Sequence, residues 1–235
     1  MVSLEQLPSI VEYQCCADLN LYDSPSCNRL ATQAATGRHL QVVSVNQDTA
    51  VEVCLCEDDY SGWLLMQDLS WVKPAAVTYQ AIAVPPVEIR TRIPDVIKFT
   101  KLAMQQPNHY LWGGTVGSNY DCSGLMQAAF ASVGIWLPRD AYQQEAFTQS
   151  IAEEELLPGD LVFFGLAHKA THVGLYVGEG CYIHSSGQEI GRNGIGIDWL
   201  SEQGDEISRS YYRQLRGAGR VIESYEPQRR RGHRG

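Results

Sequence analysis

The sequence predicts an α+β protein of two domains, in which a small all-β domain precedes a larger domain of helices and an antiparallel sheet. Short strand patterns separated by polar turns recur at intervals of roughly ten residues through the first third of the chain. A proline-rich segment follows, and beyond it a helical pattern gives way to strand patterns again. With 235 residues, the chain is long enough for two domains of ordinary size.

Residues 1–78 are predicted to form a small, strongly bent β-barrel or sandwich. Its expected strands are residues 10–15, 19–22, 40–45, 50–55 and 62–66. Residues 79–94 contain three prolines and lack an amphipathic period, so they are predicted to be an extended linker. The domain boundary is therefore expected within this segment.

Residues 95–225 are predicted to form the second domain. An apolar stripe indicates a helix after residue 94, and a second helix is expected to begin at the N-cap Asp121 and to stop at Gly134. Strands are expected at residues 160–164, 172–177, 181–184, 194–199 and 218–222. Residues 226–235, which are rich in arginine, are predicted to be a basic, disordered tail.

The composition limits the expected partners and location. The net charge of −9 disfavours binding to nucleic acid and suits a ligand with a free amine. No apolar run is long enough to span a membrane, so no membrane contact is predicted. The first residues lack the pattern of a secretory signal, and a cytoplasmic protein is therefore expected. The chain is also expected to be a monomer.

One of the seven cysteines is a candidate nucleophile. The other six show no spacing typical of a disulfide framework and are expected to be buried thiols that pack as small hydrophobic groups. Cys122 differs because it follows the N-cap Asp121 and so lies in the first turn of a predicted helix. The helix dipole and the unpaired backbone N–H groups there favour a thiolate and could stabilise an oxyanion.

Strand geometry brings two histidines together. The strands on either side of residues 178–180 fit a hairpin with a three-residue loop. In the register that pairs Val177 with Cys181, His172 and His184 lie on one face as diagonal neighbours, about 7–8 Å apart at Cα. A two-residue loop places them on opposite faces.

Cys122, His172 and His184 together fit a catalytic triad. The thiol attacks, His172 takes and returns the proton, and His184 fixes the tautomer of His172. Zinc binding is the competing chemistry for the same side chains, but they supply only three ligands, and no Glu has the spacing that zinc hydrolases use. No metal and no cofactor are therefore expected.

The second domain resembles the NlpC-type family of bacterial papain-like cysteine peptidases, which cleave peptidoglycan peptides. The resemblance rests on six segments in order, residues 110–114 (YLWGG), 121–125 (DCSGL), 134–139 (GIWLPR), 157–164 (LPGDLVFF), 172–176 (HVGLY) and 183–185 (IHS). An ordered set of motifs is more specific than any one of them. It implies a papain-like domain in which Cys122, His172 and His184 are nucleophile, base and orienting residue.

The first domain resembles a bacterial SH3-like domain through residues 59–64 (DYSGWL). Relatives that join the two domains without export are γ-D-glutamyl-L-diamino acid endopeptidases that recycle murein peptides. They hold the free amine of L-alanine with a tyrosine and an aspartate that match Tyr60 and Asp140. The resemblance thus implies a peptidoglycan-derived peptide, L-Ala-γ-D-Glu-diamino acid, as the partner. Ala141 stands where such relatives have a small hydroxyl residue.

Further residues of the second domain are candidate substrate contacts, each with a structural alternative. Asp121 is interpreted chiefly as a helix cap, and Arg139 either binds a substrate carboxylate or pairs with a neighbouring acid. The remaining candidates either line the cleft or serve local packing and hydrogen bonding: Tyr110, Trp112, Ser123 and Ser186.

Two other functions fit the same motifs. An amidase or acyltransferase on a papain-like fold acts on different bonds, and a non-catalytic peptidoglycan-binding module binds without turnover. The intact Cys–His–His set favours an enzyme over such a module.

Overall fold

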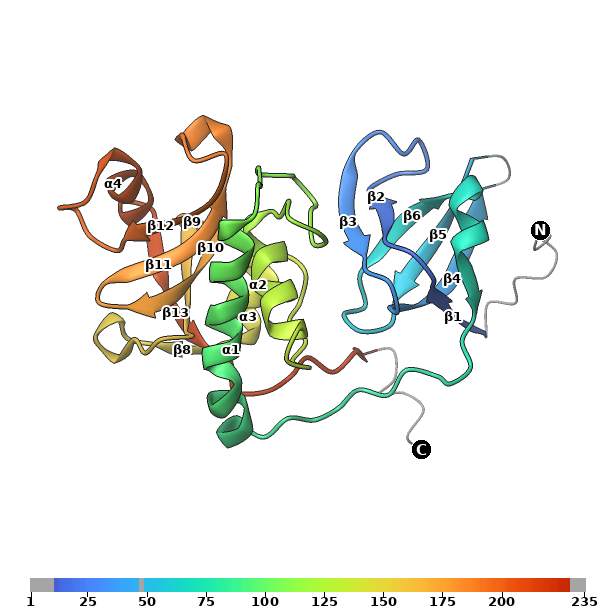
Figure 1. The fold of residues 1–235 in the computed structure, drawn as a ribbon, viewed down its shortest axis with the longest axis horizontal. Coiled ribbons are helices and arrows are strands. Elements are labelled where there is room, and N and C mark those ends of the chain that lie inside the picture. The colour runs from blue at the N-terminus through green and yellow to red at the C-terminus, as the bar shows by residue number, and fades with distance from the viewer. Residues whose placement is uncertain (1–10, 47–48, 229–235) are drawn as a thin grey trace. The chain divides into compact units, whose positions relative to one another are not determined.

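The computed structural model describes residues 11–46 and 49–228, which group into two compact units (Figure 1). The described part of the first unit comprises residues 11–46, 49–82, 112–116 and 226–228. The second unit comprises residues 83–111 and 117–225. The start of the chain, on which the expected cytoplasmic location rests, lies largely outside the described residues, as do the arginines of the predicted tail.

The first unit contains a seven-stranded sheet with the order β3-β2-β6-β5-β4-β1-β7. In chain order, a 3₁₀ helix at Met66–Trp71 connects the sixth strand to the seventh. The strands are β1 (Glu12–Cys15), β2 (Leu19–Tyr22), β3 (Leu30–Ala34), β4 (His39–Asn46), β5 (Ala50–Leu55), β6 (Ser61–Leu65) and β7 (Val72–Pro74). Five of them match expected strands. The strands β3 and β7 escape prediction because each is short and carries few apolar residues in alternation.

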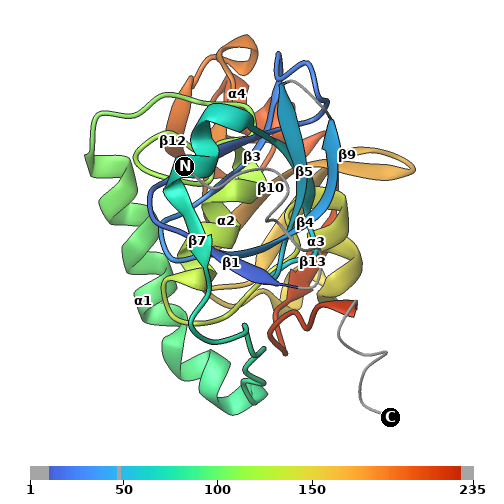
Figure 2. The same ribbon diagram turned by 90° about the vertical axis from the view of Figure 1, so that its right-hand side faces the viewer.

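The register of β4 against β5 explains the core of this unit. Leu40 pairs with Leu55 and Val42 pairs with Val53, so their side chains share one face of the two strands, which run side by side (Figure 2). All four side chains are buried in one apolar cluster. Burying each such side chain stabilises the fold by about 1.5–3 kcal/mol.

Helix α1 (Pro86–Gln105) corrects the predicted linker, which ends before residue 86 rather than at residue 94. Proline is favoured in the first turn because its missing N–H needs no partner there and its fixed φ suits a helix. Pro86 therefore starts the helix instead of preventing it. The buried face shows helical spacing from the first turns onward, at Ile89, Ile93, Val96 and Thr100.

The second unit contains a six-stranded antiparallel sheet with the order β12-β11-β10-β9-β13-β8. Its helices after α1 are α2 (Cys122–Ala131), α3 (Ala141–Phe147) and α4 (Glu206–Tyr212). Its strands are β8 (Gln149–Ile151), β9 (Leu161–Leu166), β10 (Lys169–Gly178), β11 (Cys181–Ser186), β12 (Gly194–Trp199) and β13 (Leu215–Arg220). Short 3₁₀ helices lie at Glu153–Glu155 and Gln188–Ile190. The predicted order of helices first and sheet second is confirmed, although β8 and the seven-residue helices α3 and α4 were not predicted.

The two faces of this sheet are covered differently. Alternate residues such as Phe163, Val173 and Ile183 point into a core shared with α1 and α2. Residues of the opposite parity, among them Phe164 and Tyr182, form a second cluster with α4. Figure 1 shows α1, α2 and α3 on one side of the sheet and α4 on the other. The α+β fold class is thus confirmed.

Within the described residues, no helix is long and apolar enough to cross a membrane.

Candidate active site

Cys122 is the first residue of α2. The side chain of Asp121 caps this helix, because its Oδ1 accepts the backbone N–H of Gly124 at 2.7 Å. The helix ends at Ala131, three residues before the predicted stop, and the turn that follows it ends at Gly134 in the left-handed region at φ 77°. The predicted N-cap of the helix that carries the thiol is therefore confirmed, and its end is shifted by three residues.

The resting state of this thiol differs from the prediction. Burial raises the pKa of Cys122 to about 12, assisted by the nearby charge of Asp121. The backbone N–H groups of Val173 and Ser123 lower the pKa, but they do not outweigh burial. The thiol is therefore neutral near neutral pH, and it needs a base to become a nucleophile.

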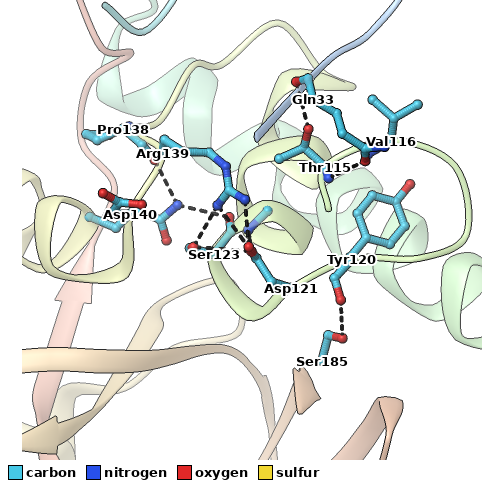
Figure 3. A network of polar contacts seen from close by, with 12 residues as sticks. Gln33, Thr115, Val116, Tyr120, Asp121, Ser123, Pro138, Arg139, Asp140 and Ser185 are labelled. Carbon is cyan, nitrogen blue, oxygen red and sulfur yellow. Dashed lines mark hydrogen bonds and ion pairs between the residues drawn. The ribbon is translucent and has the colours of Figure 1, made fainter. Parts of the chain in front are cut away.

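A buried ion pair holds the start of α2 (Figure 3). Arg139 Nη2 lies 2.6 Å from Asp121 Oδ2, and its Nη1 donates to Asp121 Oδ1 at 3.1 Å and to Ser123 Oγ at 3.0 Å. The side chain of Arg139 is 2% exposed. This contact is the acid pairing that the sequence left as an alternative, and it favours a structural role for Arg139 over direct contact with a substrate carboxylate.

The two histidines share one face of the β10–β11 hairpin, as predicted. The pairs Leu175–Ile183 and Tyr176–Tyr182 have the predicted register. The loop itself is shorter than predicted, since Gly178 pairs with Cys181. A register shift between Tyr176 and Gly178 inserts one extra residue, and this bulge restores the alternation that a two-residue loop would otherwise reverse.

The loop geometry accounts for its sequence. Glu179 and Gly180 both have positive φ, 54° and 72°, as a two-residue hairpin turn with a right-handed strand twist requires. On the strand itself, a Cβ at Gly174 would lie 2.6 Å from the ring of Tyr182 and 3.3 Å from the Cβ of His184. Glycine at position 174 therefore makes room for the second histidine.

His172 and His184 are hydrogen-bonded to each other. His172 Nε2 lies 2.6 Å from His184 Nδ1, and the two rings meet edge to face at 85°. Burial holds the pKa of both imidazoles below the ordinary value, for His172 well below it. Both rings are consequently neutral near neutral pH. Since the Cys122 thiol lies beside the backbone N–H of Val173, the nucleophile and the base meet at the same point of β10.

Three functional residues escape sequence reasoning. Asp198 on β12 accepts a hydrogen bond from His184 Nε2 at 2.7 Å, and Arg192 pairs with that carboxylate. Tyr211 on α4 stacks on His172, with ring centroids 4.4 Å apart. The β11–β12 register pairs His184 with Gly196, so Asp198 is its diagonal neighbour on the same face. That pairing was the signal that could have identified Asp198.

The remaining predicted residues of the second unit fall into two groups. Tyr110 lies near Cys122, since burial and the thiolate charge of Cys122 both raise the pKa of its phenol. Ser186 is fully buried at the end of β11. Asp140 begins α3, and its half-buried carboxylate lies within electrostatic reach of Arg139 and Asp121 and accepts a hydrogen bond from Tyr142.

Tyr60 and Trp112 belong to the first unit. Tyr60 ends the turn between β5 and β6, where its carbonyl accepts the N–H of Leu55 at 2.9 Å. The guanidinium of Arg29 lies over the ring of Trp112, 5.0 Å from its centroid. The substrate contacts assigned to these two residues stay predictions.

In the part of the chain that the structure describes, no three His, Cys, Asp or Glu side chains are arranged to hold a metal ion. Both ring nitrogens of His184 are instead engaged, one by His172 and the other by Asp198.

Comparison with known proteins identifies both units. Residues 107–217 match the NlpC/P60 family, and residues 21–69 match the bacterial dipeptidyl-peptidase Sh3 domain. These matches confirm the resemblances that the sequence motifs indicate, including the SH3-like character of the first unit.

Two curated relatives have the same name, gamma-D-glutamyl-L-lysine dipeptidyl-peptidase. The Bacillus cereus protein is 30% identical over 170 residues, which cover 70% of this chain and 46% of the relative. The Bacillus subtilis protein is 38% identical over 112 residues, which cover 45% of this chain and 36% of the relative. The chain therefore spans less than half the length of these proteins.

A crystal structure of an NlpC/P60 family protein from Bacillus cereus has a similar fold. It superposes with a TM-score of 0.50 at 24% identity, covering 90% of this chain and 64% of the other. This likeness supports the assignment of the fold.

Proposed function

Residues 107–217 belong to the NlpC/P60 family of cysteine peptidases, and we propose that this chain hydrolyses the γ-D-glutamyl-L-diamino acid bond of murein peptides that begin with a free L-Ala. The observation that carries the proposal is the placement of Cys122. Its thiol lies at the start of α2 beside β10, whose His172 is hydrogen-bonded to His184 at 2.6 Å.

The proposed reaction uses one thiol and one imidazole. The Sγ of Cys122 attacks the γ-carbonyl carbon of D-Glu while its proton passes to His172. His172 then donates that proton to the leaving amine of the diamino acid, and the C–N bond breaks to leave a thioester on Cys122. A water molecule, deprotonated by His172, attacks the thioester and regenerates the thiol.

The start of α2 offers donors for the oxyanion formed in both steps. Helix α2 begins at Cys122, so the positive end of its dipole lies at the thiol, and Tyr110 lies near the same sulfur. Tyr211 stacks on the ring of the base His172. This stacking and the hydrogen bond to His184 restrict the orientation of the imidazole.

The substrate class rests on two further points. Two curated relatives, one of them matched over 170 residues, are named gamma-D-glutamyl-L-lysine dipeptidyl-peptidase. In the second unit, the partly exposed carboxylate of Asp140 lies near the Asp121–Arg139 pair that supports Cys122, and an ionised carboxylate there suits a free amine. Tyr60 is proposed as the second amine contact. A role in recycling and a cytoplasmic location stay predictions from the sequence.

Mass spectrometry of the products tests the bond and the amine requirement together. The protein is incubated with L-Ala-γ-D-Glu-diaminopimelate and with the same peptide acetylated at its N-terminus. We expect L-Ala-D-Glu and free diaminopimelate from the first peptide and little product from the second. Equal cleavage of both peptides would remove the amine role of Asp140 and Tyr60. Release of a different fragment would favour the amidase alternative.

A further inference from the structure

A chain of hydrogen bonds leads from the base His172 to a buried carboxylate. His172 Nε2 lies 2.6 Å from His184 Nδ1, and His184 Nε2 lies 2.7 Å from Asp198 Oδ2. The side chain of Asp198 is 1% exposed. The chain therefore ends in a fixed acceptor that solvent does not compete for.

The chemistry of the carboxylate determines where each proton lies. Although burial alone would raise the pKa of Asp198, hydrogen bonds from His184 and Arg192 hold it well below the usual range. An ionised carboxylate only accepts, so His184 Nε2 must carry a hydrogen. In a neutral ring His184 Nδ1 is then bare and accepts from His172 Nε2. His172 Nδ1 is consequently left without a proton.

We propose that Asp198 is a positioning residue that, through His184, selects the tautomer of His172 whose Nδ1 can accept the proton of Cys122. The inference rests on the proposed function, since it assigns His172 as the base. It extends the three-residue site to a fourth residue, on a strand that carries none of the family motifs found in the sequence.

The carboxylate is held from its far side as well. Arg192 Nε donates to Asp198 Oδ2 at 3.2 Å, while Arg192 Nη2 and Ser208 Oγ both donate to Oδ1, the latter at 3.2 Å. Arg192 also pairs with Asp205 at 3.2 Å. Each carboxylate oxygen is therefore held by Arg192 and by one further residue, Ser208 on Oδ1 and His184 on Oδ2, and these contacts prevent the carboxylate from turning away.

Other titratable groups around the two rings are neutral near neutral pH. They are the phenols of Tyr182 on β11, Tyr211 on α4 and Tyr110, and the Cys122 thiol, all with pKa values raised chiefly by burial. Phe164 on β9 contacts His172 without charge. The ionised group hydrogen-bonded to the pair of rings is therefore Asp198, with Arg192 behind it.

The variant Asp198→Asn tests the proposal because it keeps the shape and changes the donor pattern. With the amide oxygen at the Oδ1 position, the variant keeps the hydrogen bonds from Arg192 Nη2 and Ser208 Oγ, and its NH₂ group faces His184. His184 must then accept at Nε2 and carry its hydrogen on Nδ1, which forces the hydrogen of His172 onto Nδ1, toward the thiol. We expect kcat to fall about 10- to 100-fold with little change in KM.

The pH profile separates this effect from a loss of packing. The charge of Asp198 raises the pKa of His172, so its removal is expected to move the acid limb of kcat/KM to lower pH. The matched control is Asp205→Asn, which also removes a carboxylate from Arg192 but retains a side chain able to cap α4. This control is expected to keep wild-type kcat and the wild-type acid limb.

Nitrogen-15 NMR of the imidazoles tests the tautomers without any assay of activity. In the wild-type protein, His172 and His184 should both show a protonated Nε2 and a bare Nδ1, and Asp198→Asn should reverse the pattern. A wild-type His172 protonated at Nδ1, or an Asp198→Asn variant with wild-type kcat, would overturn the proposal. If the wild-type protein cleaved no murein peptide, the proposed function would fail, while the NMR pattern would still decide the role of Asp198.

Discussion

Two aspartate–arginine pairs, each with a buried carboxylate, support the nucleophile and the histidines of the site, and they have different roles. Asp121 faces backbone and hydroxyl donors, the N–H of Gly124 and the Oγ of Ser123, besides Arg139. Asp198 faces an imidazole besides Arg192. The first pair therefore fixes the position of a helix start, whereas the second fixes the position of a proton. The different roles of Asp121 and Asp198 follow from the hydrogen-bond donors around each carboxylate.

The arginines of the two pairs also differ in their surroundings. The Arg139 side chain is 2% exposed and donates to Asp121 and Ser123 at the start of α2. The Arg192 side chain is 30% exposed and has Asp205 as a second partner. Loss of Asp121 should thus take a bidentate carboxylate from a buried guanidinium, whereas loss of Asp198 leaves a partly solvated Arg192 paired with Asp205.

Removing each carboxylate gives the largest expected difference. Asp121→Ala should lower the free energy of unfolding by about 3–5 kcal/mol, because the buried Arg139 loses its hydrogen-bonded carboxylate and α2 loses its cap. Asp198→Ala should cost only about 1–3 kcal/mol, since it leaves the buried donors of His184 and Ser208 without an acceptor while Arg192 keeps Asp205. Urea unfolding of the two variants beside the wild-type protein measures both. Equal losses of unfolding free energy in the two variants would show that the two carboxylates contribute equally to stability, contrary to this account.

A second prediction concerns the nucleophile Cys122 and the pH dependence of its alkylation. Because burial raises the pKa of Cys122 to about 12, its rate of reaction with iodoacetamide should keep rising above about pH 9 and show no plateau in the acid range. Peptide mapping by mass spectrometry separates Cys122 from the exposed Cys16. A plateau below about pH 6 would indicate a preformed thiolate–imidazolium pair instead of a neutral thiol and base.

The smallest expected effect concerns His172 and His184, and it is a change in the free energy of unfolding with pH. His172 and His184 have folded-state pKa values below the ordinary 6.5, so the unfolded chain binds more protons as the pH falls. The free energy of unfolding should therefore decrease as the pH falls below about 6.5. Asp198 acts in a lower window, because its ordinary pKa is 3.8 and its folded value is lower still.

Unfolding in urea at about pH 7.5 and about pH 5 measures this loss. The variant His184→Gln should reduce the difference between the two pH values. Substitution of the exposed His168 by Gln, His168→Gln, serves as the control and should leave the difference unchanged. A His184→Gln variant that keeps the full difference would show that the loss arises elsewhere.

The parts of the site that the sequence predicts are those set by local pattern. An N-cap followed by helical periodicity places Cys122, and strand alternation places His172 and His184 on one face. The bulge that preserves this face was not predicted, because its only sign is one extra residue before the turn.

The parts that the sequence leaves out depend on contacts distant in the chain. Asp198 reaches His184 only through the β11–β12 register, and Tyr211 reaches His172 only because α4 folds over that face. Prolines caused the error in the predicted linker, since the same residue type that breaks a helix in its middle begins one at Pro86.

The central claim is that Cys122 and His172 perform the hydrolysis, and single substitutions test it most directly. Cleavage of L-Ala-γ-D-Glu-diaminopimelate is followed by mass spectrometry for the wild-type protein and the variants Cys122→Ala and His172→Ala, with and without EDTA. The account predicts a loss of at least about 1,000-fold in kcat for each variant and no effect of EDTA. Wild-type turnover by either variant, or its loss on chelation, would contradict the account.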